Sequence, residues 1–279
     1  MSVAEAVSLL TQHEGARCLA GGATLVAMMN AGLVEPSCLI SLANLHDLAG
    51  ITVSPDGSVR IGAMTRHVET SRSRVFRGGQ RVLPAAAVKI ANVPVRNMGT
   101  IGGSLAFADP AADYLPALAA IDAAIEVASA SGPRTVPINE LIVDWYTTVL
   151  APSDIIARVV VPPAPEGSVG VFEKLERTAG DFAVVSVAVI LAMEHDVCRV
   201  ARVAIGACGP GPVRRSEAET VLEGSHLEDA AIETAGDILA AACDPVDDVR
   251  ASADYRRRVI PRLLAKTIRR ARAAIGDEP

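Results

Sequence analysis

The sequence feature that most constrains the fold is a pair of glycine-rich segments in the first half of the chain. The first, residues 19–25, reads Leu-Ala-Gly-Gly-Ala-Thr-Leu, and the second, residues 97–113, holds Gly99, Gly102 and Gly103 within five positions. Glycine has no Cβ, so the backbone can turn sharply at these positions and come close to another group. We therefore expect the two segments to organise the rest of the chain.

The first glycine segment lies between a predicted strand and a predicted helix. An apolar run at 18–20 precedes Gly21 and Gly22, and a helix-like stretch from Thr24 to Ala31 follows them. Amide N–H groups at such a turn, together with the positive end of the helix dipole, attract phosphate. The candidate contacts are Ala20, Gly21, Gly22, Ala23, Thr24 and Leu25. Because the Gly-x-Gly-x-x-Gly and Walker A patterns are both absent, the pattern favours a nucleotide held by a different fold.

The second glycine segment has two interpretations when it is considered alone. As a binding loop, it offers free N–H groups at Gly102 and Gly103, hydroxyl donors at Thr100 and Ser104, and a carboxylate at Asp113 placed to hold sugar hydroxyls. As an ordinary turn, it only bends the chain, and Asp113 is the N-cap of the following helix. Short glycine motifs are weak evidence singly. Two such turns in one chain can clasp a pyrophosphate from both sides, which favours a dinucleotide site.

Composition excludes several classes of function. The net charge is −6 and aromatic residues make up 3% of the chain, which argues against nucleic acid as a partner. The longest apolar run, residues 182–193, has 12 residues and is too short to span a bilayer. The 5 cysteines form no Cys-x-x-Cys pair, so no iron–sulfur or zinc site is indicated, and reduced thiols in the cytoplasm are expected. We assign no catalytic and no metal-binding residue.

Periodicity and turn signals outline the remaining elements. The patterns predict helices at 3–12, 82–91 and 114–121, a short helix from Thr65, as its cap, to Ser71, strands at 38–42, 124–128, 155–161 and 168–175, and a hairpin around Pro55-Asp56-Gly57. The Val-rich run at 182–193 is ambiguous between helix and strand, and we expect it to pair as a strand with 198–207. Three helices are expected beyond, at 216–222, 228–242 and 255–274.

Four motifs along the chain carry a family resemblance. They are Ala20-Gly21-Gly22-x-x-Leu25, then Thr100-Ile101-Gly102-Gly103-Ser104 with Asp109-Pro110-x-x-Asp113, then Lys174-Leu175-x-Arg177-x-x-Gly180-Asp181-Phe182-Ala183, and finally Asp254-Tyr255-Arg256. In this order they resemble the FAD-binding (medium) subunit of molybdenum hydroxylases, the carbon monoxide dehydrogenase and xanthine dehydrogenase family. The resemblance covers essentially the whole chain. It departs at Ala23, where a polar residue is common, and at Ser104, where Asn is frequent, and neither change removes a backbone N–H group.

The resemblance implies a fold and a cofactor. The fold is α+β: an FAD-binding domain at 1–165, of the PCMH-like or vanillyl-alcohol-oxidase-like type, is followed by a smaller antiparallel sheet with helices at 168–279. The first domain has two subdomains, roughly 1–55 and 56–165, with the flavin between them. FAD binding is expected to be non-covalent, because neither glycine motif contains a His or Cys that could form a flavin bond. By the same resemblance Ile101 belongs to the second motif, Lys174 lies near the isoalloxazine ring and Ile156 lines it.

The resemblance also implies a division of labour among subunits. A large partner holds molybdopterin and oxidises the substrate, a small partner carries [2Fe–2S] clusters, and this chain passes electrons through FAD to an external acceptor. The expected assembly is a heterotrimer or a dimer of heterotrimers. Carbon monoxide, purines, alkaloids, aldehydes and aryl-CoA thioesters all stay open as substrates, as do the acceptor and the docking surface. Two other classes also stay open: a self-contained flavin reductase or oxidase, and a non-enzymatic nucleotide-binding scaffold.

Overall fold

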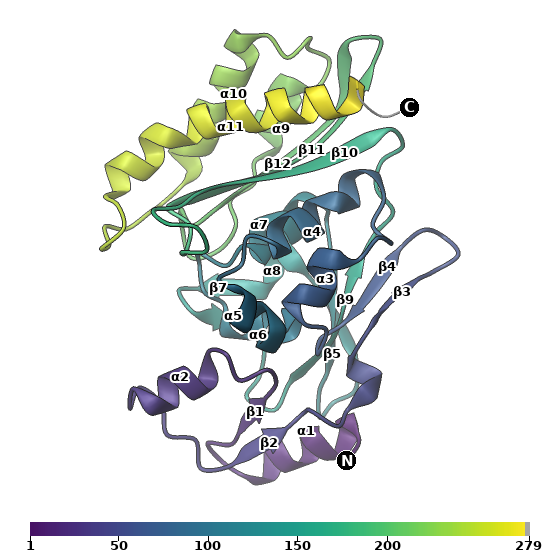
Figure 1. Cartoon of the computed structure of the whole chain (residues 1–279), viewed down its shortest axis with the longest axis vertical. Helices are drawn as coiled ribbons and strands as arrows, with labels where there is room; N and C mark the ends of the chain where they lie inside the picture. The colour runs from purple at the N-terminus through teal and green to yellow at the C-terminus, as the bar shows by residue number, and fades with distance from the viewer. Residues whose placement is uncertain (277–279) are drawn as a thin grey trace.

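The computed structural model, which describes residues 1–276, is built around a five-stranded and a three-stranded sheet stacked along the length of the molecule (Figure 1). The N-terminal unit lies at one end and the C-terminal helices at the other. The last three residues of the predicted second domain, 277–279, fall outside the described part. Within residues 1–276, no helix is long and apolar enough to cross a membrane.

The N-terminal unit is small and forms the lower end of the molecule in Figure 1. It consists of α1 (Val3–Gln12), β1 (Arg17–Leu19), α2 (Leu25–Asn30), β2 (Leu39–Ser41) and the 3-10 helix η1 (His46–Leu48). Ser2 and Glu5 form a capping box that starts α1, and Val7 and Leu10 bury its apolar face. Strand β1 pairs with β2 in parallel. The predicted helix at 3–12 is confirmed, and the predicted strands are correct within one residue.

The central unit holds an antiparallel sheet with the strand order β3-β4-β9-β5-β6. The strands are β3 (Ile51–Val53), β4 (Val59–Gly62), β5 (Ala124–Ala128), β6 (Arg134–Pro137) and β9 (Ile155–Val161). Around it lie α3 (His67–Arg72), η2 (Gly78–Arg81), α4 (Val82–Ala87), α5 (Val93–Met98), α6 (Ile101–Phe107), α7 (Tyr114–Ala120), α8 (Ile138–Leu141) and the short hairpin β7 (Ile142–Asp144) and β8 (Thr147–Thr148). The β3–β4 hairpin spans residue 55, where we drew the limit between the two subdomains.

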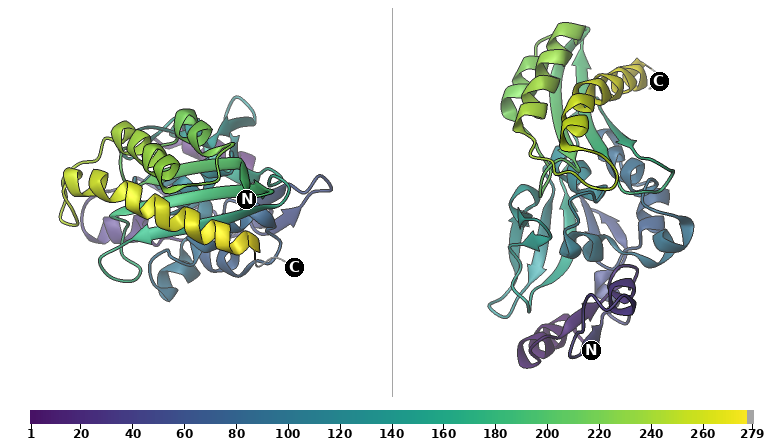
Figure 2. Two further views of the ribbon diagram at one scale, coloured as in Figure 1. Left: turned by 90° about the horizontal axis from the view of Figure 1, so that it is seen from above. Right: turned by 90° about the vertical axis from the view of Figure 1, so that its left-hand side faces the viewer.

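The C-terminal unit is a three-stranded antiparallel sheet covered on both faces. Its strands are β10 (Ser168–Leu175), β11 (Val185–Glu194) and β12 (Val197–Gly206), and its helices are α9 (Ser216–Leu222), α10 (Asp229–Ala242) and α11 (Ala253–Gly276). Helices α4 and α7 of the central unit pack on one face, and α9 and α11 on the other (Figure 2). Alternate residues of β11 therefore face two cores: Ala188 and Ile190 join the central one, and Val187 and Val189 the outer one. The predicted hairpin is confirmed.

In the central unit one local prediction fails and one helix was missed. Thr65 does not cap α3: Arg66 occupies the N-cap position, and the Thr65 hydroxyl donates to the carbonyl of Gly50. No element was predicted where α5 lies. Proline is tolerated in the first turn of a helix, and the side chain of Asn92 caps α5 by accepting from the amide of Val95 at 3.0 Å.

The contact of β10 with η2 generates a stability prediction. A Cβ added at Gly170 would lie 2.1 Å from the carbonyl oxygen of Gly79 and 2.7 Å from the amide nitrogen of Val82, both of them backbone atoms. Gly170→Ala is therefore expected to lower the free energy of unfolding by about 1–3 kcal/mol. Gly209→Ala, whose Cβ meets only ordinary contacts at 3.8 Å and beyond, is the matched control. Urea denaturation measures both, and equal stability of the two variants would contradict the close packing.

Candidate functional site

The two glycine segments line one cavity of 790 Å³. The N-terminal unit supplies one wall, α5, α6 and the loop to α7 supply another, and residues 180–182 of the C-terminal unit lie at its edge. A cavity of this size is within the range of small-molecule and cofactor sites. Of the sequence-predicted site residues, the structure brings these to the cavity: Ala20, Gly21, Gly22, Ala23, Thr24, Leu25, Thr100, Gly102, Gly103, Ser104, Asp113 and Ile156.

The first glycine segment keeps its amide groups free. Within residues 1–276, the N–H groups of residues 21–25 donate to no backbone or side-chain acceptor. Gly22 has φ +74°, a left-handed conformation that glycine adopts at little cost. A Cβ at Gly21 would lie 1.8 Å from the carbonyl oxygen of Met98, so this glycine lets the two segments touch. Five consecutive residues of the cavity wall therefore have unpaired amides, where the two segments meet.

The second glycine segment is helical, which contradicts the expected loop with free amides. Gly102 and Gly103 lie in the first turn of α6, and Thr100 is its N-cap. The amide of Gly102 donates to the carbonyl of Ala63 at 2.8 Å, and the amide of Gly103 to the Thr100 hydroxyl at 3.2 Å. These glycines instead allow close packing, since a Cβ at Gly102 would lie 2.5 Å from the Ala63 methyl. Gly103 faces the first segment, with its added Cβ 3.9 Å from the Ala20 methyl.

Asp113 has a different role from the predicted N-cap. It occupies the position before α7, but its side chain makes no capping hydrogen bond. Its Oδ2 accepts from the ammonium of Lys174 at 3.0 Å, while its buried Oδ1 has no hydrogen-bond partner in the described chain. Burial raises the pKa of Asp113 to about 6, against the attraction of Lys174. An unpaired acceptor on the cavity wall fits a ligand that carries hydroxyl groups.

Lys174 does not line the cavity. Its side chain is 1% exposed, so Lys174 is not a surface lysine. Besides Asp113, its ammonium donates to the carbonyls of Lys89 and Asp181, at 2.8 and 2.9 Å. Glu176 Oε2 lies 3.1 Å from the same nitrogen. The three protons of the ammonium are therefore used by protein acceptors. Ile101 is likewise fully buried and absent from the cavity wall, whereas Ile156 on β9 lines it.

Several cavity residues were missed by the sequence reasoning. Cys18 and His67 line the wall, and so does Phe182, which belongs to a quoted motif but was given no role. Burial, with a contribution from the charge of Arg96, lowers the pKa of His67 to about 4, so the imidazole is neutral near pH 7. Its Nδ1 is buried with no partner in the described chain. No local pattern around His67 distinguishes it from the other scattered histidines, because the residues that it packs against, Gly99 and Tyr114, are distant in sequence.

The α+β fold, with two glycine-rich segments lining one cavity, fits the class of nucleotide-binding proteins. Comparisons with known proteins identify the family. Residues 1–164 match the model described as "FAD binding domain in molybdopterin dehydrogenase", and residues 170–271 match the "CO dehydrogenase flavoprotein C-terminal domain". The chain belongs to this family of molybdenum-hydroxylase flavoprotein subunits. The resemblance and the fold class expected from the sequence are confirmed.

Individual relatives cover nearly the full chain. The 6-hydroxypseudooxynicotine dehydrogenase complex subunit alpha of Paenarthrobacter nicotinovorans is 37% identical, over 97% of this chain and 93% of that protein. The carbon monoxide dehydrogenase medium chain of Hydrogenophaga pseudoflava is 33% identical, over 97% and 94%. The structure of quinoline 2-oxidoreductase from Pseudomonas putida 86 contains a chain with a TM-score of 0.92 and 30% identity, over 98% and 95%. The chain is thus an FAD-binding subunit of an oxidoreductase.

The buried His67 predicts a pH dependence of stability. Its pKa is lower in the folded chain, about 4, than the ordinary 6.5, so the unfolded chain binds the extra proton between these values. Its contribution is complete above pH 6.5 and is lost as the pH falls to 4, by about 3 kcal/mol. The difference between wild type and His67→Gln in urea denaturation isolates this contribution, because all other groups are common to both. The same loss in both proteins between pH 7.5 and 4 would contradict it.

Proposed function

We propose that this chain is the electron-transfer subunit of a heteromeric molybdenum hydroxylase. In this proposal it takes electrons from [2Fe–2S] clusters on a small partner and passes them through FAD to an external acceptor, while a large partner with molybdopterin oxidises the substrate. The observation that carries it is the cavity with five free amides and the unpaired Asp113 oxygen, in a chain of this family. Relatives named as a medium chain or a complex subunit support the assignment to an assembly.

The residues of the cavity fit the parts of FAD. We propose that the amides of residues 21–25 bind the pyrophosphate, with the hydroxyls of Thr100 and Ser104 beside them. Asp113 accepts a hydrogen bond from a ribityl hydroxyl through its free Oδ1, and Ile156 contacts the apolar ring. Lys174 acts through Asp113, because its own protons are committed to protein acceptors. When bound, FAD supplies the capacity to accept and release electrons.

We propose that FAD is held non-covalently, although a cysteine and two histidines line the cavity. Burial raises the pKa of the Cys18 thiol to about 11, so it is not a thiolate near pH 7, and the thiolate is the nucleophilic form. His67 forms part of the packing around Gly99, where an added Cβ would lie 2.5 Å from its Nε2. These observations support binding through hydrogen bonds and packing alone.

The proposal extends to domain limits, assembly and location. We retain an FAD-binding domain at 1–165 and a C-terminal domain from 168, and move the limit between subdomains to a point before β3, because β3 pairs with β4. The assembly is a dimer of heterotrimers, and the location is cytoplasmic, which the 5 free cysteines support. The substrate contacts belong to the large partner, so all the substrate classes named above stay open.

Gly103→Val tests the cavity as the flavin site. The added methyl groups start from a Cβ 3.0 Å from the Thr100 hydroxyl and point toward Ala20, so they fill the space between the two segments. Bound flavin, measured in the supernatant after acid precipitation, is expected to fall at least about tenfold. Ser104→Ala is the control and loses one hydroxyl, about 0.5–1.5 kcal/mol of binding. Equal occupancy in wild type and Gly103→Val would reject the cavity as the site, and flavin remaining in the pellet would reject non-covalent binding.

Anaerobic mixing separates the electron-transfer subunit from a self-contained flavin enzyme. The flavin-loaded chain alone is expected to keep its oxidised spectrum with each class of organic substrate, and to be reduced by the correct one once the molybdenum and iron–sulfur subunits are added. Loss of the visible absorption of the oxidised flavin reports its reduction. Rapid bleaching by a substrate in the absence of partners would favour the stand-alone oxidoreductase, and a chain that binds no flavin would favour the scaffold.

A further inference from the structure

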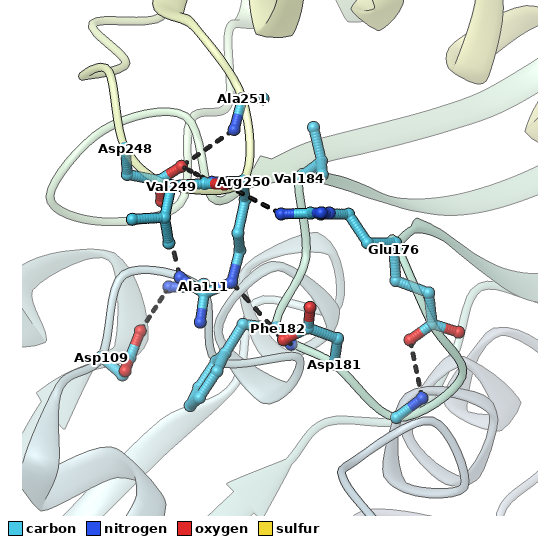
Figure 3. Close-up of polar contacts among 12 residues, drawn as sticks. Asp109, Ala111, Glu176, Asp181, Phe182, Val184, Asp248, Val249, Arg250 and Ala251 are labelled. Atoms are coloured by element: carbon cyan, nitrogen blue, oxygen red, sulfur yellow. Dashed lines mark hydrogen bonds and ion pairs between the residues drawn. The ribbon is translucent and has the colours of Figure 1, made fainter.

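A loop between α10 and α11 of the C-terminal unit lies beside Asp181 and Phe182 (Figure 3), two residues that line the cavity. It carries Arg250, whose guanidinium lies 5.0 Å from the centre of the Phe182 ring. The same guanidinium pairs with Asp181 through Nε at 3.5 Å and with Asp248 through a terminal nitrogen at 3.5 Å. Arg250 therefore joins two segments separated by 69 residues of sequence.

The loop that presents Arg250 is itself firmly held. Asp248 Oδ1 accepts from the amides of Arg250 and Ala251 at 2.8 and 3.0 Å, and from the buried guanidinium of Arg256 at 2.6 Å. Arg256 also donates to the carbonyl of Val184 at 2.7 Å, just beyond Phe182 in the chain. On the other side, Arg177 donates to the carbonyl of Val249 at 3.0 Å. These bonds hold the backbone from which Arg250 extends, and the carboxylates of Asp181 and Asp248 hold its guanidinium.

Phe182 is the side chain that the Arg250 guanidinium contacts. It lines the cavity, yet it is 45% exposed, in contrast to the buried apolar residues that follow it in β11. Its backbone is set on the cavity side by the Asp181 carboxylate, which accepts from the Phe182 amide at 2.7 Å, and by Lys174, which holds the Asp181 carbonyl. Those contacts fix the backbone only. The Arg250 guanidinium lies over the ring, 5.0 Å from its centre, where cation–π attraction favours this position of the side chain.

We propose that Arg250 is a positioning residue that holds the Phe182 ring across the mouth of the flavin cavity and thereby slows the release of FAD. The inference rests on the proposed function, because it assumes that the ligand of the cavity is FAD. Arg250 itself does not line the cavity wall, so its effect passes through Phe182. The C-terminal unit thus contributes to FAD retention from outside the glycine segments.

The test compares rates of FAD loss from the full chain after dilution, with released flavin collected by ultrafiltration. Arg250→Met removes the charge and keeps an apolar stem, and FAD is expected to leave about tenfold faster. Arg250→Lys keeps a cation and is expected to restore most of the retention. Arg258→Met is the matched control, because Arg258 lies 5.6 Å from the Tyr255 ring in an equivalent pair that does not border the cavity, and it is expected to match wild type.

A double-mutant cycle with Phe182→Leu shows whether Arg250 acts through the ring. Phe182→Leu alone is expected to speed FAD loss, and adding Arg250→Met to it is expected to change the rate less than twofold. Fully additive effects would overturn the proposal, as would unchanged retention in Arg250→Met. A lower unfolding temperature of the FAD-free Arg250→Met chain, with no rescue by Arg250→Lys, would show a merely structural role and also overturn it. Wild type that fails to retain FAD would contradict the proposed function instead.

Discussion

The buried ammonium of Lys174 is the interaction on which the rest of the site depends. It joins the loop after α4 through the Lys89 carbonyl, the start of α7 through Asp113, and the segment before β11 through the Asp181 carbonyl. A buried cation is costly unless its charge and protons are matched, and loss of one partner from such a pair destabilises by about 3–5 kcal/mol. Because Lys174 belongs to β10 and Asp113 lines the cavity, this ammonium ties the C-terminal sheet to the cavity wall.

Besides the Lys174 contacts, the site depends on glycines that let backbone segments approach each other closely. Gly21 touches the Met98 carbonyl, Gly102 packs on Ala63, and Gly180, with φ +84°, lies against the Ala91 carbonyl. Side chains at these positions would force apart the walls of the cavity. The glycines of the two segments therefore have different roles: the first segment leaves its amides unpaired, whereas Gly102 lets α6 pack closely on Ala63.

The sequence predicts elements better than it predicts the site. The bounds of β5, β9, β10 and α9 agree with the structure residue for residue, because alternation, Pro-Pro and Gly-Pro breaks and a polar helix start are local signals. The free amides of residues 21–25 follow from the strand–turn–helix pattern. The satisfied amide of Gly102 does not, because its acceptor, the carbonyl of Ala63, lies 39 positions earlier at about the end of β4 and no local pattern links the two. The pairing of Asp113 with Lys174, 61 residues away, depends on the C-terminal sheet packing against α4 and α7, which no local pattern reveals.

The protonation state of Asp113 depends on the packing around it and on Lys174, and it determines which hydrogen bonds this part of the cavity wall can make. Burial raises its pKa to about 6 while Lys174 opposes that rise, and Glu176 competes for the same ammonium at 3.1 Å. The ionised carboxylate has only acceptor oxygens, among them the unpaired Oδ1, whereas the protonated acid has one acceptor fewer and one donor more. The Lys174 contact therefore shifts the pH at which Asp113 changes from acceptor to donor, in opposition to burial. Lys174 does not line the cavity, so it acts on the cavity wall through Asp113.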